Sequence, residues 1–280
     1  MKFKFLAAVA LATSCVIGAG IDYNTLISHR GESMDAPENT LPAFKLAVER
    51  GFGFECDIYL SADKRCFTFH DRNLKRTTGG KNTKKCSEAN WDTEISKLDV
   101  GSWGKWKDSK YVGTPPALLE DVLKLARDGR YIYVEIKAGV EIVPYIKEVF
   151  AKQSNATPKN ALFICFNANV CAALKKAMPE YKVYWLTPSA RKGNDGKKVG
   201  VSADSVIATL KKLGVDGVDI HFNEAFQDKA FFDKIKAAGF ETHVWTVNKY
   251  ESAKKAFEFG AQTLTTDCAK KLYDAHHAAK

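Results

Sequence analysis

The chain has 280 residues, of which 45% are hydrophobic and 27% are charged, and a formal net charge of +9 at pH 7. This length and composition are ordinary for a globular protein and are enough for one large domain with a well-buried core. The positive charge would suit an anionic substrate, an anionic lipid surface or nucleic acid. The lysines are scattered along helical stretches and form no dense basic block with interleaved aromatic residues, which argues against nucleic acid as a partner.

The first 20 residues form a segment of their own. They begin with Lys2 and Lys4, continue as an apolar run and end in small residues, which is the pattern of a signal peptide. The apolar run is too short for a good membrane-spanning helix. We therefore expect residues 1–20 to be a signal peptide and the protein to be exported, either periplasmic or secreted. Cys15, in "LATSC", leaves open a lipoprotein whose lipid anchor would be its only contact with a membrane.

Six cysteines remain after this segment: Cys56, Cys66, Cys86, Cys165, Cys171 and Cys268. Their spacings match no zinc-binding pattern. Several lie in or beside apolar runs, where a cysteine is most often a small buried hydrophobic residue. An exported protein allows disulfide bonds, but the sequence gives no connectivity.

Short apolar runs then alternate with amphipathic segments. The first run, residues 25–29, reads as a strand and is followed by a helix that begins after Thr40 and ends at Gly51. Residues 53–60 form the next strand, which returns through a hairpin arm at residues 65–71. The chain up to this point predicts a strand, a helix and a hairpin.

Residues 72–117 form a long insertion after this hairpin, because they are irregular but contain tryptophans that need something to pack against. Beyond it the alternation resumes, in chain order, with a helix at 117–129, a strand at 131–137, a helix at 140–153, a strand at 161–166, a helix at 169–180, a strand at 182–187, a helix at 203–214, a strand at 215–220, a helix at 228–239, a strand at 241–247, a helix at 249–260 and a strand at 261–267.

Without the hairpin arm, this pattern contains eight strands, nearly all of them followed by a helix. The apolar runs lack strict alternation, as expected for parallel strands that are buried on both faces. Eight such units in about 250 residues predict an α/β fold of the TIM (β/α)8 barrel type over residues 21–280. Its functional site would lie at the carboxyl ends of the strands. A doubly wound sheet is the alternative.

Acidic residues occur where two of the predicted strands end. Glu55 and Asp57 lie two apart in one strand, and Glu135 and Lys137 lie two apart in the next, so each pair shares a face. Three carboxylates at one barrel mouth are costly to bury unless a cation neutralises them. All-oxygen ligation suits a hard divalent ion, Ca²⁺ or Mg²⁺, rather than zinc. The alternative is a set of separate salt bridges.

Two histidines also fall at strand ends. His29 ends the first strand and His70 ends the hairpin arm, and imidazole can accept or donate a proton near neutral pH. Arg30 and Lys137 supply positive charge for an anionic group such as phosphate. We expect Asn39, in "PENT", to tie down the loop after the first strand and to orient His29.

One further histidine, His243, lies two residues before Trp245 in the predicted strand at 241–247. It should therefore point into the barrel but deeper than the site, so we expect it to be a core residue.

Several motifs occur together in an order that matches a known family. They are "HRG", "PENTLPAF", "FECDIYLSADKRCFTFHD", "LKRTTGG", "VEIK", "WTVN" and "TTD", and they extend from about residue 26 to residue 267. This combination resembles the glycerophosphodiester phosphodiesterases. The resemblance implies a TIM barrel with a small insertion after the "HD" motif. It also implies metal-dependent hydrolysis of glycerophosphodiesters to glycerol 3-phosphate and an alcohol.

The resemblance further implies a role for each residue of the site. It assigns nine residues: Glu55, Asp57 and Glu135 to one divalent cation, His29 and His70 to general base and acid catalysis, Arg30 and Lys137 to the phosphate, and Phe166 and Trp245 to the glycerol moiety. In the mechanism proposed for this family, the 2-hydroxyl of the substrate attacks phosphorus, and water then opens the cyclic phosphate. The chain departs from the family at Cys165, often a serine, at "PPAL" (115–118), usually "PTL", and at Lys64, often a glycine. Cys165 and the insertion concern the substrate head group rather than the chemistry.

Two other functions remain open. A sphingomyelinase D-like phospholipase would use the same barrel, metal and histidines on membrane lipids or lyso-lipids, and Trp103 and Trp106 could then meet the membrane. A non-catalytic binding protein on the same fold would usually have lost one of the acids or histidines. We expect a small-molecule substrate. The sequence does not determine its alcohol group, the choice between Ca²⁺ and Mg²⁺, or the oligomeric state.

Overall fold

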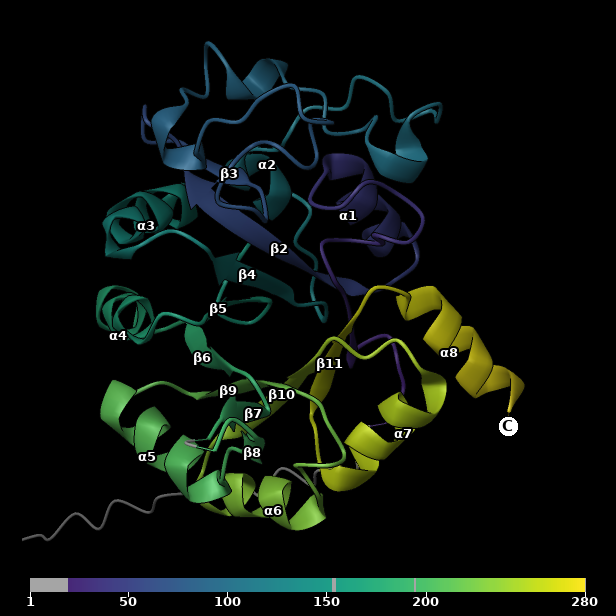
Figure 1. Ribbon diagram of the computed structural model, residues 1–280, viewed down its shortest axis with the longest axis vertical. Helices are drawn as coiled ribbons and strands as arrows, with labels where there is room; N and C mark the ends of the chain where they lie inside the picture. The colour runs from purple at the N-terminus through teal and green to yellow at the C-terminus, as the bar shows by residue number, and fades with distance from the viewer. Residues whose placement is uncertain (1–19, 153–154, 194, 280) are drawn as a thin grey trace, which may run out of the picture.

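Eight parallel strands close into a barrel in the computed structural model, which describes residues 20–152, 155–193 and 195–279 (Figure 1). Around the barrel the strands are β1 (Leu26–Ser28), β11 (Thr263–Thr266), β10 (Glu241–Trp245), β9 (Gly217–His221), β6 (Lys182–Thr187), β5 (Ala161–Cys165), β4 (Ile132–Ile136) and β2 (Gly53–Leu60). β1 pairs with both β11 and β2, so the sheet closes on itself. The predicted TIM barrel is confirmed, and a doubly wound sheet with open edges is excluded. The segment predicted as a signal peptide lies outside the described residues, apart from Gly20.

The helices lie outside the strands and surround them (Figure 1). They are α1 (Leu41–Glu49), α2 (Leu119–Leu123), α3 (Val143–Ala151), α4 (Ala168–Ala177), α5 (Ala203–Leu213), α6 (Lys229–Ala237), α7 (Tyr250–Phe259) and α8 (Ala269–Ala278). Thr40 caps α1 as predicted, since its side-chain oxygen accepts a hydrogen bond from the N–H of Ala43. α2 is shorter than the predicted helix at 117–129: it ends at Leu123, and the chain then continues as turns up to Gly129, where φ is 71°.

The long segment between β3 (Cys66–Thr68) and α2 has no strand and forms three short 3₁₀ helices, η1 (Cys86–Glu88), η2 (Ile95–Lys97) and η3 (Gly104–Trp106). It lies at the top of Figure 1, above α1 and α2. Its own small core contains Phe67, Phe69, Leu74, Ile95 and Trp91. A second excursion, the exposed hairpin of β7 (Ala190–Lys192) and β8 (Lys198–Gly200), was not predicted.

Side chains of the barrel strands alternate between two apolar layers. On β9, Val218 and Ile220 belong to the large core between strands and helices, whereas Asp219 lies on the inner face. The inner layer contains Ile27, Tyr133, Leu162, Ile164, Tyr184 and Leu186. These large side chains fill the inside of the barrel, and two of them, Ile164 and Leu186, also line a cavity at the carboxyl ends of the strands.

His243 is a core residue, as the sequence indicated. Its side chain is fully buried on the inner face of β10. Nδ1 lies 2.6 Å from Thr263 Oγ1, and Nε2 lies 2.6 Å from Thr265 Oγ1. Burial lowers the pKa of His243 to about 3. The imidazole is therefore neutral at neutral pH.

We expect this buried imidazole to make the protein sensitive to moderate acid. The pKa of His243 falls from 6.5 to about 3 on folding, so below pH 6.5 the unfolded chain binds a proton that the folded chain does not. This contribution to stability is complete above pH 6.5 and decreases as the pH falls toward 3; at pH 5 the loss is about 2 kcal/mol.

Urea unfolding at pH 7 and pH 5 measures this effect. The free energy of unfolding should fall by about 2 kcal/mol more in the wild type than in His243→Gln, which cannot take up the proton. An equal fall in both proteins would show that other groups cause the acid sensitivity.

All six cysteines of the described residues are buried and carry free thiols. Cys165, for example, donates a hydrogen bond from Sγ to the carbonyl oxygen of Ile136 at 3.1 Å. In the part of the chain that the structure describes, no helix combines the length and the apolar character needed to span a membrane.

Candidate active site

The nine residues that the sequence assigned to the site lie together at the carboxyl ends of the barrel strands. Eight of them line a cavity of about 310 Å³: His29, Arg30, Glu55, His70, Glu135, Lys137, Phe166 and Trp245. The ninth, Asp57, is fully buried and lies within 3.2 Å of Arg30 and 3.1 Å of Lys137. They meet because strand side chains two residues apart share the inner face of the barrel.

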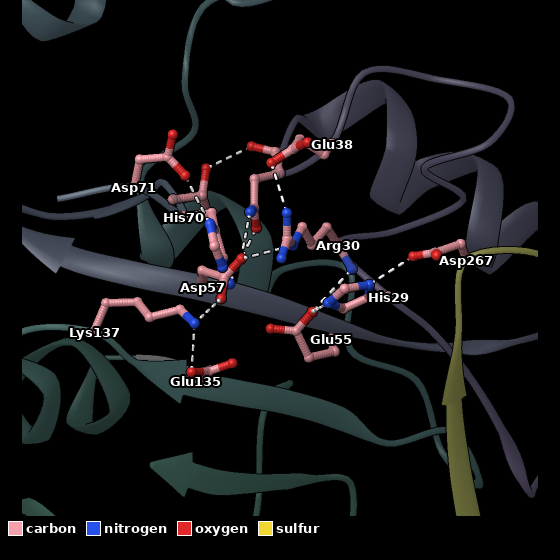
Figure 2. A network of polar contacts seen from close by, with 12 residues as sticks. His29, Arg30, Glu38, Glu55, Asp57, His70, Asp71, Glu135, Lys137 and Asp267 are labelled. Atoms are coloured by element: carbon pink, nitrogen blue, oxygen red, sulfur yellow. Dashed lines mark hydrogen bonds and ion pairs between the residues drawn. The ribbon is translucent and has the colours of Figure 1, made fainter. Parts of the chain in front are cut away.

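Three carboxyl groups lie close together under this cavity (Figure 2). One oxygen each of Glu55, Asp57 and Glu135 lies within 4.8 Å of the other two, and the three residues are 1%, 0% and 7% exposed. Glu55 Oε1 has no hydrogen-bond partner among the described residues. Buried carboxylate oxygens gathered from three acids, one of them without any polar partner, are the donor set that a hard divalent cation requires. The group can therefore hold a metal ion.

The pKa values of the three acids also favour a bound cation. Burial, and then the Asp57 and Glu135 carboxylates, raise the pKa of Glu55 well above its ordinary value. Burial and Asp57 likewise raise the pKa of Glu135 to about 7. Burial alone would raise the pKa of Asp57 too, but Lys137 and Arg30 outweigh it and lower that pKa. The protein's own cations thus outweigh burial at one carboxylate, and a further positive charge would favour ionisation of the other two.

Each of the two histidines is held by an aspartate at Nδ1. His29 Nδ1 lies 2.6 Å from Asp267 Oδ1, and His70 Nδ1 lies 2.7 Å from Asp71 Oδ1 (Figure 2). Asn248 in turn donates a hydrogen bond to Asp267 at 2.6 Å. Because Nδ1 is occupied, Nε2 is the nitrogen left for proton transfer in both rings. His29 Nε2 lies on the cavity side, 4.0 Å from Glu55 Oε2.

Arg30 is fixed by a strained backbone and by two acids. Its φ is 59°, which places it in the left-handed region. Its backbone N–H donates to Glu55 Oε2 at 2.9 Å, and its guanidinium lies within 3.2 Å of Asp57 and 2.9 Å of Glu38. Strain of this kind persists only where surrounding contacts compensate it, and it is frequent at functional sites.

Asn39 does tie down the loop, but the expectation that it orients His29 is wrong. Its Nδ2 donates to Asp57 Oδ2 at 2.7 Å, and its Oδ1 accepts from the N–H of Asp57 at 3.0 Å. Its φ of 57° turns the side chain toward β2. Asn39 therefore orients a carboxylate of the acidic group, whereas Asp267 orients His29.

Arg76, which the sequence did not assign to the site, links two acids of the site, Glu38 and Asp71. It makes two hydrogen bonds to Glu38, at 2.7 and 2.9 Å, and two to Asp71, at 2.8 and 3.0 Å. Glu38 contacts Arg30 and Asp71 contacts His70, so one guanidinium supports both. The motif "LKRTTGG" was the signal that could have identified it. The insertion is thereby connected to the site.

The remaining wall of the cavity is apolar. Phe166 and Trp245 meet edge to face, with ring centroids 5.6 Å apart, and Ile164 and Leu186 lie beside them. Phe166 is 47% exposed and so marks the opening of the cavity. Trp245 donates from Nε1 to the backbone carbonyl of Asp219 at 3.2 Å, which fixes the indole. The cavity thus has one charged and one apolar side.

Comparison with known proteins identifies the family. The glycerophosphoryl diester phosphodiesterase family matches residues 29–271. A glycerophosphodiester phosphodiesterase of Caldanaerobacter subterraneus subsp. tengcongensis is 33% identical over 250 residues, which cover 86% of this chain and 93% of that protein. The human lysophospholipase D is 26% identical over 90% of this chain and 85% of its own length.

A solved structure agrees with these sequence matches. An Oleispira antarctica phosphodiesterase, in complex with the product sn-glycerol-3-phosphate, superimposes with a TM-score of 0.76 at 26% identity, over 90% of this chain and 96% of that chain. The resemblance inferred from the motifs is confirmed. The chain therefore belongs to the glycerophosphoryl diester phosphodiesterase family and is a phosphodiester hydrolase.

Proposed function

We propose that this protein hydrolyses glycerophosphodiesters to glycerol 3-phosphate and an alcohol, using two histidines and one divalent cation, Ca²⁺ or Mg²⁺. The observation that carries the proposal is the meeting of three buried acids, two aspartate-held histidines and two cationic side chains around one cavity. The complex of the Oleispira relative with sn-glycerol-3-phosphate supports the choice of product.

The residues divide the reaction between them. Glu55, Asp57 and Glu135 would hold the cation, which when bound supplies positive charge to the phosphoryl oxygens. Arg30 and Lys137 would bind the same group and stabilise its developing charge. The phosphodiester would thus lie between the acidic group and the apolar wall.

The two histidines would carry the protons. One imidazole accepts the proton of the substrate's 2-hydroxyl as that oxygen bonds to phosphorus. The other donates a proton to the alcohol oxygen as its bond to phosphorus breaks. The roles then reverse: the imidazole that donated a proton accepts one from water as the water oxygen bonds to phosphorus. The other imidazole returns its proton to the 2-oxygen as the bond from that oxygen to phosphorus breaks, which yields glycerol 3-phosphate.

The direct test is a set of glycerophosphodiesters with choline, ethanolamine and glycerol as the alcohol. The chelated protein should release no glycerol 3-phosphate, and Ca²⁺ or Mg²⁺ should restore release from at least one diester. Absence of release from every diester with either ion would contradict the proposal.

A lysophospholipid is the second candidate substrate, since the human relative is a lysophospholipase D and Phe166 is exposed at the opening. The tryptophans of the insertion do not favour a membrane contact. Trp103 packs under the Arg76 guanidinium, 5.0 Å from its ring centroid, and Trp106 packs against Tyr111. Lysophosphatidylcholine vesicles in the same assay would compare the two candidates.

We also propose that the protein is exported, on the signal-peptide pattern of residues 1–20. Fractionation of the producing cell and N-terminal sequencing of the mature chain would test this. A mature chain starting at about Ile21 would indicate a soluble form. One starting at an acylated Cys15 would indicate a lipoprotein.

Arg76→Lys should lower kcat for diester hydrolysis by about 10- to 100-fold while the thermal midpoint stays near that of the wild type. A lysine cannot reproduce the four hydrogen bonds by which the guanidinium holds Glu38 and Asp71. Because Asp71 holds His70, the pH profile of kcat should shift as well.

The matched control is Arg72→Lys, the same change at an exposed position of the same segment. It should leave kcat and its pH profile unchanged. An Arg76→Lys variant with wild-type kcat would show that the link between insertion and site is dispensable.

A further inference from the structure

One buried carboxyl group of the cavity has no role in the reaction as described. Asp219 lies in the middle of β9, is 1% exposed and lines the cavity beside Leu186 and Trp245. Neither of its carboxyl oxygens has a hydrogen-bond partner among the described residues. Burying a carboxyl group in this way costs free energy, and such exceptions call for a functional explanation.

The neighbouring His243 does not satisfy Asp219. The two are paired in register on β9 and β10, but Nε2 of His243 is 3.9 Å from Asp219 Oδ1. Both ring nitrogens of His243 are already engaged by Thr263 and Thr265. The imidazole is neutral, since burial lowers its pKa to about 3, so it forms no ion pair either.

The surroundings of Asp219 favour an uncharged ligand group. Burial, and then the Glu135 carboxylate, raise the pKa of Asp219 well above its ordinary value. A protonated carboxyl group offers one O–H donor and one carbonyl acceptor. An alcohol hydroxyl offers the complementary acceptor and donor.

The position of Asp219 indicates which hydroxyl this is. Phe166, at 47% exposed, marks the open end of the cavity, whereas Asp219, at 1% exposed, marks its buried, closed end. The alcohol of the diester must leave and varies in size, so it belongs at the open end. The glycerol moiety is small and stays with the phosphate, so it belongs at the closed end. Its 2-hydroxyl takes part in the proposed reaction, which leaves the 1-hydroxyl.

We propose that Asp219 is a specificity-determining residue that hydrogen-bonds the free 1-hydroxyl of the glycerol moiety and so selects fully deacylated glycerophosphodiesters over 1-acyl lysophospholipids. The inference rests on the proposed function and refines its substrate class. An ester at this position cannot donate a hydrogen bond, and its acyl chain would meet the closed end of the barrel. The site therefore rejects 1-acyl lysophospholipids in two ways: they would leave the Asp219 carboxyl group without a hydrogen-bond partner, and the closed end of the cavity has no room for their acyl chain.

The test compares glycerophosphocholine with its 1-deoxy analogue, in which a methyl group replaces the terminal hydroxymethyl group and the 2-hydroxyl remains. The wild type should prefer glycerophosphocholine by about 100-fold or more in kcat/KM. Asp219→Ala should lose about that factor on glycerophosphocholine and little on the analogue, whereas Asp219→Asn, which keeps a donor and an acceptor, should retain part of the preference.

Thermal melting of the same variants shows whether they fold normally. Asp219→Ala should melt at the wild-type temperature or above it, because it removes a buried carboxyl group that lacks a partner. Replacement of the exposed Asp204 on α5 by alanine serves as the matched control and should leave kcat/KM unchanged for both substrates. Equal losses on both substrates in Asp219→Ala, or equal turnover of both by the wild type, would overturn the proposal.

Two further arms separate the explanations. A loss in Asp219→Ala confined to choline and ethanolamine diesters, with the glycerol diester unaffected, would assign Asp219 to a cationic head group and overturn the proposal. If the wild type released no glycerol 3-phosphate from any diester, the proposed function would fail. Calorimetry would still test the role of Asp219 by measuring the binding of two phosphates. The wild type should bind glycerol 3-phosphate at least tenfold more tightly than propane-1,2-diol 1-phosphate, and Asp219→Ala should show no such difference. Equal affinities of the wild type for the two phosphates would contradict the proposed role of Asp219.

Discussion

Replacing either His29 or His70 by alanine should lower kcat for diester hydrolysis by about 10³-fold while metal binding is retained. Each ring is anchored at Nδ1, by Asp267 in one case and by Asp71 in the other, and neither histidine belongs to the acidic group that would hold the cation. The variants therefore remove a proton carrier and leave the ligands in place. Metal binding by calorimetry and turnover measured on the same samples test this expectation.

The two histidines can be told apart by the leaving group. A glycerophosphodiester of 4-nitrophenol has a leaving group that departs without a proton. It should restore most of the rate to the variant that lacks the acid and none to the variant that lacks the base. The exposed His277→Ala on α8 is the control and should behave as the wild type. Near-wild-type turnover of glycerophosphocholine by either site variant would remove that histidine from the mechanism.

Replacing Glu55 by glutamine should weaken the binding of Ca²⁺ and Mg²⁺ by roughly 100-fold or more and reduce turnover in parallel. Glu55 Oε1 is buried without a hydrogen-bond partner, so it is the ligand oxygen with no other contact in the described structure. An amide oxygen at this position carries no charge and binds a hard cation more weakly. Excess metal should restore part of the rate.

The metal-free proteins give an independent readout. Without a cation, Glu55→Gln should be about as stable as the wild type, because burial and the Asp57 and Glu135 carboxylates raise the pKa of Glu55 and so disfavour its charged form. Added metal should raise the melting temperature of the wild type and of Glu148→Gln, an exposed control on α3, but not that of Glu55→Gln. Unchanged metal affinity in Glu55→Gln would mean that the three acids form ordinary salt bridges.

The barrel could be predicted from the sequence because its strands are buried on both faces and read as apolar runs. β2 and β6 have the predicted bounds, and the other barrel strands differ by one or two residues at their ends. The hairpin of β7 and β8 could not be predicted, since it is exposed and polar and no apolar periodicity marks it. The same applies to the end of α2 at Leu123, which no change in composition marks.

The side chains that surround the cavity were predictable for a similar reason: charged residues stand out when they end an apolar strand. The residues that hold these side chains in position could not be predicted in the same way. Arg76 comes from an irregular segment, and only the folded chain connects it to Arg30, through Glu38. Asp219 lies between apolar neighbours in β9, so an acid inside an otherwise buried strand was the signal. Asn39 shows the converse, because its place in a motif did not reveal which residue it contacts.

The closure of the barrel between β1 and β11 has a consequence for the timing of activity. His29 follows the first strand and its partner Asp267 follows the last, so 238 positions of chain separate two groups that must touch. A ribosome must complete nearly the whole polypeptide before this imidazole can be anchored, and contacts of such long range form slowly. A nascent chain, or one that lacks Asp267, therefore cannot anchor His29, and the site is complete only once the first and last strands have paired.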